Sequence, residues 1–457
     1  FSGLLGSAQL DQNSIASSRE LLNRFVSFYS NASYTYDDKY VLSGSIRWDR
    51  SNLWGTNSKY QNKPLWSVGG SWNIYKEKFF QADFVDMLKL RASYGIGGNI
   101  GRNTAPYLIA SYYDSSLVDG MAGSVNTPPN KDIRWEKTTT VNVGVDFALF
   151  RHRLSGTIEY YNKYSVDLLA AINGSPTQGF GYTTLMTNNG KMVNRGVEIT
   201  LSGEIIRQKD FSWNASLLYA FNRNKVKHIS VQPSLWDSRI SMPTSYPMVG
   251  KPLYGIYAYK WAGLNENGDP QVYDAENNVT SGPARDYHAL VYCGTTVPIH
   301  NASLTNVLRY KGFEFSAMLI LDAGHKLRSS NIPSINMSNG RITSTAKGIV
   351  DRWTQPGDVT DVPRLLFSND TENFNTHRTE LYRYSDLFVY DASNIRLSNI
   401  SLAYRVPAHW CKKISLSGAR LQFNVENVAT FAFDSKANYD LGGKVKPNYV
   451  WGLYLNF

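Results

Sequence analysis

The chain of 457 residues is poor in the side chains from which metal centres are built. Its two cysteines, Cys293 and Cys411, stand far apart in the sequence. Its seven histidines are widely spaced, and none stands at a metal-ligand interval from another or near a cysteine cluster. The sequence therefore predicts no metal site and no bound cofactor.

Long apolar runs and basic runs are absent as well. No stretch approaches the roughly 18 apolar residues that a membrane helix needs, and the mean hydropathy is negative. The formal net charge is +10, but the lysines and arginines are scattered singly along the chain. A nucleic-acid partner would require a basic patch or stripe, so we expect none.

What the sequence does contain is a two-residue alternation of apolar and polar side chains. Residues 211–222 place one set of side chains on one face of a strand and a second set on the opposite face. The apolar set is Phe211, Trp213, Ala215, Leu217, Tyr219 and Phe221, and the polar set includes Ser212, Asn214, Ser216 and Asn222. A strand of this kind can meet lipid on one face and an aqueous lumen on the other.

The alternation recurs in segments of about 9 to 11 residues, the length of a tilted bilayer-spanning strand. We predict thirteen strands, over residues 25–36, 40–50, 64–76, 87–97, 137–148, 153–165, 192–203, 211–222, 301–310, 313–322, 392–405, 418–427 and 447–457. Short connections at 37–39, 77–86, 149–152, 204–210, 311–312 and 406–417 alternate with long ones at 51–63, 98–136, 166–191, 223–300, 323–391 and 428–446. Bacterial barrels have short periplasmic turns and long extracellular loops, so the alternation supports these strands.

The predicted fold class is all-β, a transmembrane antiparallel β-barrel in the outer membrane with a periplasmic C-terminus. The 30 tyrosines, 20 phenylalanines and 11 tryptophans suit the two membrane interfaces of such a barrel, although a soluble β-sandwich can also be rich in aromatics. The topology places Cys293 and Cys411 on opposite sides of the membrane, so no disulfide is expected. We expect an extracellular hairpin within 252–300 and a β-bulge near 395–404, where the alternation changes parity.

Thirteen strands leave two sheet edges, and unpaired backbone groups are costly in hydrocarbon. We therefore expect the partner strands to come from a region before Phe1, and residues 1–457 to be the C-terminal portion of one barrel domain. The last strand alternates up to Phe457, as expected for the strand that closes a barrel and directs its insertion.

Six stretches in order along the chain resemble landmarks of the SusC/RagA family of TonB-dependent outer-membrane transporters. They are residues 33–51, which begin SYTYDDKY and end SIRWDRS, 88–95 (LKLRASYG), 135–140 (WEKTTT), 194–198 (NRGVE), 259–265 (YKWAGLN) and 352–363 (RWTQPGDVTDVP). The last strand is a looser version of the family's ending.

The resemblance implies a barrel of about 22 strands that is closed by a plug. It also implies a segment that engages TonB, and a SusD-like surface lipoprotein that caps the barrel and captures glycans or peptides. The resemblance is also compatible with a dimer of such pairs of transporter and lipoprotein lid. The plug and the TonB-engaging segment would lie outside this chain.

Several residues are candidates for a functional role, and each also has a simpler structural interpretation. Aromatic side chains in the long loops, Trp236, Tyr246, Tyr254 and Tyr292, could stack on sugar rings or on apolar peptide side chains, or could pack within the loops. Glu159 and Glu198 could be imagined as glycosidase acids, but both fall on the polar face of strands. The acidic turn 265–269 with Asp274 and Glu276 lacks the order of an EF-hand loop, which favours a hairpin turn over a calcium site. We expect no catalytic residue.

The function that these patterns favour is an energised importer of oligosaccharides or peptides with a SusD-like lid. A passive porin shares the strand pattern but has no plug, and a surface adhesive or structural barrel would use its loops to bind other proteins. Neither alternative is excluded by the residues alone.

Overall fold

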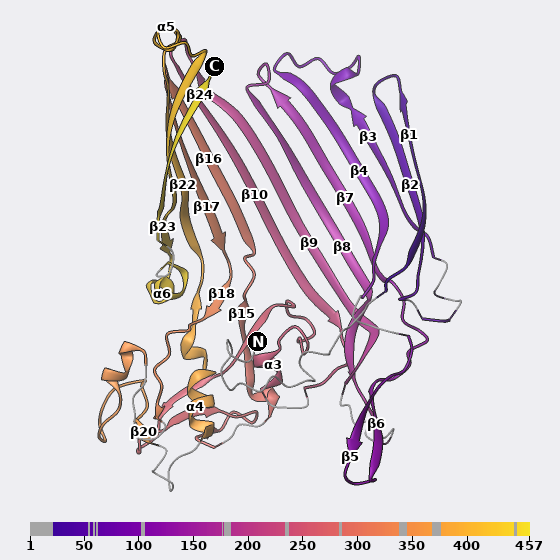
Figure 1. Cartoon of the computed structure of the whole chain (residues 1–457), viewed down its shortest axis with the longest axis vertical. Helices are drawn as coiled ribbons and strands as arrows, with labels where there is room; N and C mark the ends of the chain where they lie inside the picture. The colour runs from indigo at the N-terminus through magenta and orange to yellow at the C-terminus, as the bar shows by residue number, and fades with distance from the viewer. Residues whose placement is uncertain are drawn as a thin grey trace, which may run out of the picture.

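One large antiparallel sheet forms most of the protein (Figure 1). The computed structural model describes residues 22–53, 55–57, 60, 63–101, 106–175, 177, 184–233, 237–282, 286–337, 345–367, 376–442 and 446–457. The sheet has thirteen strands in the order β1-β2-β3-β4-β7-β8-β9-β10-β16-β17-β22-β23-β24. They are β1 (Phe25–Tyr36), β2 (Tyr40–Ser51), β3 (Leu65–Asn73), β4 (Val85–Asn99), β7 (Glu136–Leu149), β8 (Leu154–Asn173), β9 (Thr184–Arg207), β10 (Phe211–His228), β16 (His300–Tyr310), β17 (Phe313–Ala323), β22 (Asn394–Arg405), β23 (Gly418–Ala432) and β24 (Asn448–Asn456).

Each of these strands coincides with one of the thirteen predicted from the alternation, and each pairs with the strand next to it in the predicted series. The predicted fold class is thereby confirmed. Within the described chain, β1 and β24 each have a neighbour on one side only, so the sheet is open. The predicted bulge is confirmed too, because the register between β22 and β23 shifts between Leu397 and Asn399.

The short connections lie at one end of the sheet and the long ones at the other (Figure 1). At the short-turn end, Asp37, Asp38 and Lys311 adopt positive φ angles of 51°, 52° and 51°, which tight antiparallel turns require. The longer turn between β22 and β23 contains the helix α5 (Ala408–Lys412). Among the residues that the structure describes, every helix is too short or too polar to cross a lipid bilayer.

The register brings side chains of one kind into rows across the sheet. Leu201, Leu217, Leu304, Leu319 and Leu397 are paired in sequence from β9 to β22. The neighbouring row is Ser202, Ser216, Thr305, Met318 and Asn399, and the register passes over Ser398 in β22. Side chains at cross-strand partners share a face, so the sheet has an apolar face and a largely polar face, as the alternation predicted.

Two of the long connections fold together at the long-loop end of the sheet. We call the described residues of 229–299 and 324–393 the loop subdomain. Its small sheets and helices are α3 (Ser238–Ser241), β11 (Gly255–Tyr259), β12 (Trp261–Leu264), β13 (Pro270–Tyr273), β14 (Val279–Thr280), η3 (Tyr287–Ala289), β15 (Leu290–Thr295), β18 (Lys326–Arg328), β19 (Asn336–Met337), η4 (Lys347–Asp351), β20 (Leu366–Phe367), α4 (Thr376–Arg383), η5 (Asp386–Phe388) and β21 (Val389–Asp391).

The loop subdomain has two buried clusters of its own. Tyr257 and Tyr259 of β11 pack with Leu381 of α4 in the first cluster, and Ile335 packs with Tyr382 and Phe388 in the second. The first cluster combines residues from the two connections, and Trp261 of the first connection packs against the second cluster, so the connections stabilise each other. The expected hairpin within 252–300 is confirmed in that β11 to β15 pair outside the main sheet and add no strand to it; its extracellular location stays a prediction.

Some elements differ from the predicted boundaries. β3 ends at Asn73 rather than at residue 76, because residues Ile74–Lys76 form the short helix η1. β8 and β9 continue beyond the predicted residues 165 and 192, and pair as far as Asn173 with Thr184. The connection after β4 contains a separate hairpin of β5 (Ile109–Ser115) and β6 (Gly120–Thr127), and the connection after β23 contains η6 (Ser435–Ala437) and α6 (Asn438–Leu441).

Candidate functional site

Charged side chains gather on the polar face in β4, β7 and β8. Arg91 Nε lies 3.1 Å from a carboxylate oxygen of Asp146, and Arg91 Nη2 pairs with Glu159. Thr157 donates a hydrogen bond of 2.9 Å to Asp146. Glu159 is opposite Glu198 in the β8–β9 register, so the two carboxylates share the polar face as predicted. Because Glu159 is already paired with Arg91, this arrangement is that of a structural ion pair.

Two hollows open on the polar face. The first, of about 350 Å³, is lined mainly by serine and glycine residues of β1 to β4, with Lys89 and Arg91 at its border. The second, of about 310 Å³, extends from β9 to β17 and contains the carboxylates Glu198 and Asp322. The polar face therefore carries both positive and negative side chains around these hollows.

A third cavity, of about 330 Å³, lies where β8, β9 and β10 reach the long-loop end. Leu168, Met192 and Val226 line it from the strands, and Pro247 and Leu253 line it from the connection after α3. We call this cavity the mouth pocket. The alternation pattern alone did not predict this pocket, although the apolar residues at the polar-face positions 192 and 226 were a signal for it.

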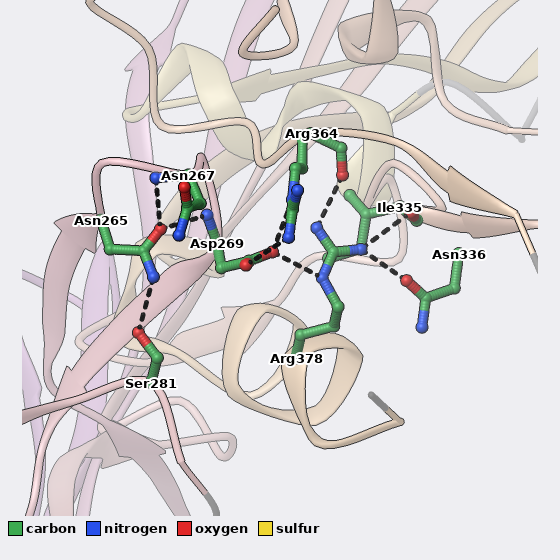
Figure 2. A network of polar contacts seen from close by, with 8 residues as sticks. All are labelled: Asn265, Asn267, Asp269, Ser281, Ile335, Asn336, Arg364 and Arg378. Carbon is green, nitrogen blue, oxygen red and sulfur yellow. Dashed lines mark hydrogen bonds and ion pairs between the residues drawn. The ribbon is translucent and has the colours of Figure 1, made fainter. Parts of the chain in front are cut away.

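A carboxylate shared by two arginines holds the loop subdomain together (Figure 2). Arg364 Nη2 donates to Asp269 Oδ2 at 2.7 Å, and Arg378 Nε donates to Asp269 Oδ1 at 3.1 Å. The Arg378 side chain is 3% exposed and also donates to the carbonyl oxygens of Ile335 and Arg364 and to Asn336 Oδ1. Burial lowers the pKa of Arg378, and the negative charge of Asp269 opposes that shift. The cluster joins the turn before β13, the helix α4 and the segment before β20.

The acidic turn at 265–269 is a hairpin turn, as the sequence favoured. Asn265 Oδ1 accepts hydrogen bonds from the backbone N–H groups of Asn267 and Asp269, and Asn265 Nδ2 donates to Ser281 Oγ (Figure 2). Asp274 caps the next turn by accepting from the backbone N–H of Asn278 at 2.7 Å. Within the described ranges, no three histidine, cysteine, aspartate or glutamate side chains are placed to share a metal ion.

Other ionisable groups of the loop subdomain are shifted by their surroundings. Burial raises the pKa of the Cys293 thiol to about 11, so the thiol is protonated at neutral pH. Burial opposes ionisation of Asp391, but hydrogen bonds from Ser393 and Lys326 outweigh it and lower the Asp391 pKa to about 2. Cys293 and Cys411 are both free thiols, and they lie in connections at opposite ends of the sheet, as predicted.

The four loop aromatics named as candidates for stacking on a ligand or packing within the loops occupy different environments. Tyr246 is only 8% exposed, whereas Tyr254 is 46% exposed. Tyr292 packs against Tyr257 at 5.9 Å between ring centroids, with Lys251 Nζ 4.9 Å from its ring. Trp236 lies outside the described residues. Tyr254 is thus the most accessible of the three described rings, and the structure does not gather the three into one stacking surface.

Comparison with known proteins matches almost the whole chain to one family. The model of the family described as "TonB dependent receptor-like, beta-barrel" matches residues 5–428. The chain is 27% identical over 456 residues to TonB-dependent receptor P3 of Formosa agariphila, covering 94% of this chain and 43% of that protein. It is 25% identical over 427 residues to TonB-dependent receptor SusC of Bacteroides thetaiotaomicron, covering 89% of this chain and 40% of that protein. The chain therefore spans less than half the length of these relatives.

Solved structures support the same fold. The RagAB peptide transporter superposes with a TM-score of 0.75 at 24% sequence identity, over 95% of this chain and 48% of that chain. The RagAB peptide importer in its open-open state gives a TM-score of 0.74 at 24% identity, over 95% and 47% of the two chains. The likeness concerns the arrangement of strands.

Proposed function

Because this chain belongs to the family of TonB-dependent receptor-like β-barrels, we propose that it forms part of an outer-membrane importer of oligosaccharides or peptides. The observation that carries the proposal is the pairing of apolar and polar rows across thirteen strands. An apolar face can contact lipid while the polar face lines a water-filled route. The ordered SusC/RagA landmarks, of which YKWAGLN and RWTQPGDVTDVP lie in the loop subdomain, support this family assignment.

We infer that the chain supplies the C-terminal strands of a barrel of about 22 strands, with its C-terminus in the periplasm. The remaining strands, the plug and the segment that engages TonB would belong to the rest of the importer. A SusD-like lipoprotein would cover the mouth, and transporter–lid pairs could associate as dimers. The loop subdomain supports this because it presents a packed, preformed surface at the long-loop end.

Import requires no covalent chemistry from this chain. The relatives named above are receptors and transporters, and the Glu159 carboxylate is neutralised by Arg91. We propose that Tyr254 contributes a ring at the mouth for a passing sugar or apolar side chain, since it is the most exposed of the described candidates. Trp236, Tyr246 and Tyr292 remain candidates of the same kind.

Uptake measured in cells tests the proposal. We expect a strain that lacks the complete gene to lose uptake of at least one labelled oligosaccharide or peptide pool, and collapse of the proton gradient to abolish that uptake in the parent strain. A passive porin would continue to pass the solute after the gradient is collapsed. Unchanged uptake of every oligomeric nutrient in the deletion strain would contradict import.

A further inference from the structure

We propose that the mouth pocket binds an apolar side chain of a peptide substrate. The inference rests on the proposed import function and names the substrate class within it. Its starting point is a cavity of about 330 Å³, which lies within the range of roughly 300–1,000 Å³ that small-molecule sites occupy. A volume of that size accommodates one large aliphatic or aromatic side chain.

The strand wall of the mouth pocket is apolar on the face that is otherwise polar. Met192 pairs with Val226 across β9 and β10, and one pair further along the polar face is Asn194 with Asn224. Gly190 pairs with Leu168 across β8 and β9, so these residues share a face with Met192. The polar face therefore changes from amides to aliphatic and thioether groups where it reaches the mouth.

The opposite wall of the mouth pocket is held in place by backbone hydrogen bonds. Val226 N donates to Lys251 O at 2.9 Å, and Gly250 N donates to Val226 O at 2.8 Å. Leu253 N donates to Asn224 Oδ1 at 2.8 Å. Pro247 and Leu253 are thereby fixed against the strands, so the pocket is formed before any ligand arrives. A preformed apolar pocket avoids the ordering cost that would otherwise weaken binding.

The lining favours an apolar side chain over a sugar. The lining that the structure describes includes the imidazole of His228 and the polar side chains of Lys191, Thr244 and Ser245, but no phenylalanine, tyrosine or tryptophan ring on which a pyranose could stack. The Glu136 carboxylate at its border already accepts from Leu169 N at 2.8 Å and from Asn99 Nδ2 at 2.8 Å. A sugar hydroxyl placed among the aliphatic groups would lose its hydrogen bonds to water, whereas a leucine side chain would be stabilised by the same burial.

Binding to the complete transporter, purified with its lipoprotein partner, tests this assignment. The probes are a pentapeptide with one leucine between two pairs of glycines, pentaglycine, and a linear pentasaccharide of glucose, each titrated calorimetrically. We expect the leucine peptide to bind about tenfold more tightly than pentaglycine or better, because one buried leucine side chain gives a difference of that order.

Two variants localise the effect. Ala170 lies beside Leu168 and Gly190 in the pocket wall, and we expect Ala170→Trp to fill the cavity and remove the preference for leucine. Met192→Gln keeps the side-chain length but adds an amide, and we expect the same loss. Val279→Trp in β14, where the side chain is 50% exposed, is the matched control and should leave the preference unchanged.

Equal affinity for the two peptides, failure of both to bind, or a leucine preference that survives both pocket variants would overturn the inference. Binding of the pentasaccharide alone would also overturn it while leaving the import function intact. Loss of the import function itself would be seen separately, as unchanged nutrient uptake in the deletion strain.

Discussion

At the scale of single residues, Asp269 links two arginines that are distant from it in the sequence. It accepts from Arg364 and from the buried Arg378, whose side chain is 3% exposed. Removing one partner of a buried ion pair leaves the other charge without compensation, which is far more destabilising than losing a surface pair. The turn that carries Asp269 could be predicted from its Asn, Gly, Asp and Pro residues. The contact of Asp269 with Arg378, which is 109 positions away, could not be predicted, because no residue pattern near either position specifies it.

Asp269→Asn should destabilise the loop subdomain by about 3 kcal/mol, because Arg378 would remain buried without a counter-charge. Hydrogen exchange of β13 and α4 in the assembled protein measures the corresponding local opening free energy. Glu266→Gln removes an exposed carboxylate from the same turn and serves as the control. Equal protection in the two variants would show that the Asp269 cluster does not hold the subdomain together.

Asp391 makes the β18–β21 pair sensitive to acid. Its pKa is lowered from 3.8 to about 2, so its contribution to stability is present above pH 3.8 and is lost as the pH falls through 2. We expect the exchange protection of β18 and β21, corrected for intrinsic rates, to fall over that interval. Asp391→Asn should lower protection at neutral pH and remove the dependence between pH 4 and 2, whereas an unchanged acid transition in this variant would assign the effect to another group.

At the scale of elements, glycine placement explains one of the sequence landmarks. Gly196, in the NRGVE stretch of β9, is opposite Tyr161 of β8, and a Cβ atom at Gly196 would clash with the Tyr161 ring. Tyr161 is 7% exposed, so its ring lies flat on the sheet over this glycine. Only a residue without a side chain permits that packing.

Gly196→Val should therefore reduce the folded fraction of the barrel, with a cost of about 1–3 kcal/mol from overpacking. The heat-dependent mobility of the protein in gel electrophoresis measures that fraction. Gly97→Val in β4 is the control, since a Cβ atom there meets nothing closer than the Thr138 carbonyl oxygen at 4.0 Å. Replacing Tyr161 by alanine together with Gly196→Val should recover part of the loss, and no recovery would place the clash elsewhere.

The thirteen strands could be predicted because lipid imposes a strict two-residue alternation on every segment that crosses it. β8 and β9 continue past their predicted ends because their outer parts do not follow this alternation. Asp167, with a positive φ of 56°, accompanies a register shift, and the apolar Leu168 and Met186 no longer follow the alternating pattern. We infer that the parts of β8 and β9 beyond the predicted ends do not contact lipid, so their side chains need not alternate between apolar and polar. The mouth pocket was missed for the same reason.

At the scale of the whole molecule, the connections after β10, β17 and β23 contact one another at the long-loop end of the sheet. The loop subdomain unites the connections after β10 and β17 through its buried clusters. The connection after β23 joins them, because the Asp440 carboxylate accepts from the Ser329 and Ser330 hydroxyls at 2.8 and 2.6 Å. Such long-range packing gives the mouth a defined shape, although its separate segments carry only turn and loop signals in the sequence.

We expect the row through Leu304 to meet lipid and the neighbouring row through Thr305 to meet the lumen. Spin labels at these two positions of β16, in the complete protein in lipid vesicles with Cys293 and Cys411 replaced by serine, test it directly. We predict that the label at 304 collides mainly with oxygen, which concentrates in lipid, and that the label at 305 is poorly accessible to oxygen. Equal oxygen accessibility at the two sites, or a label at 304 relaxed by a water-soluble nickel complex, would contradict the account.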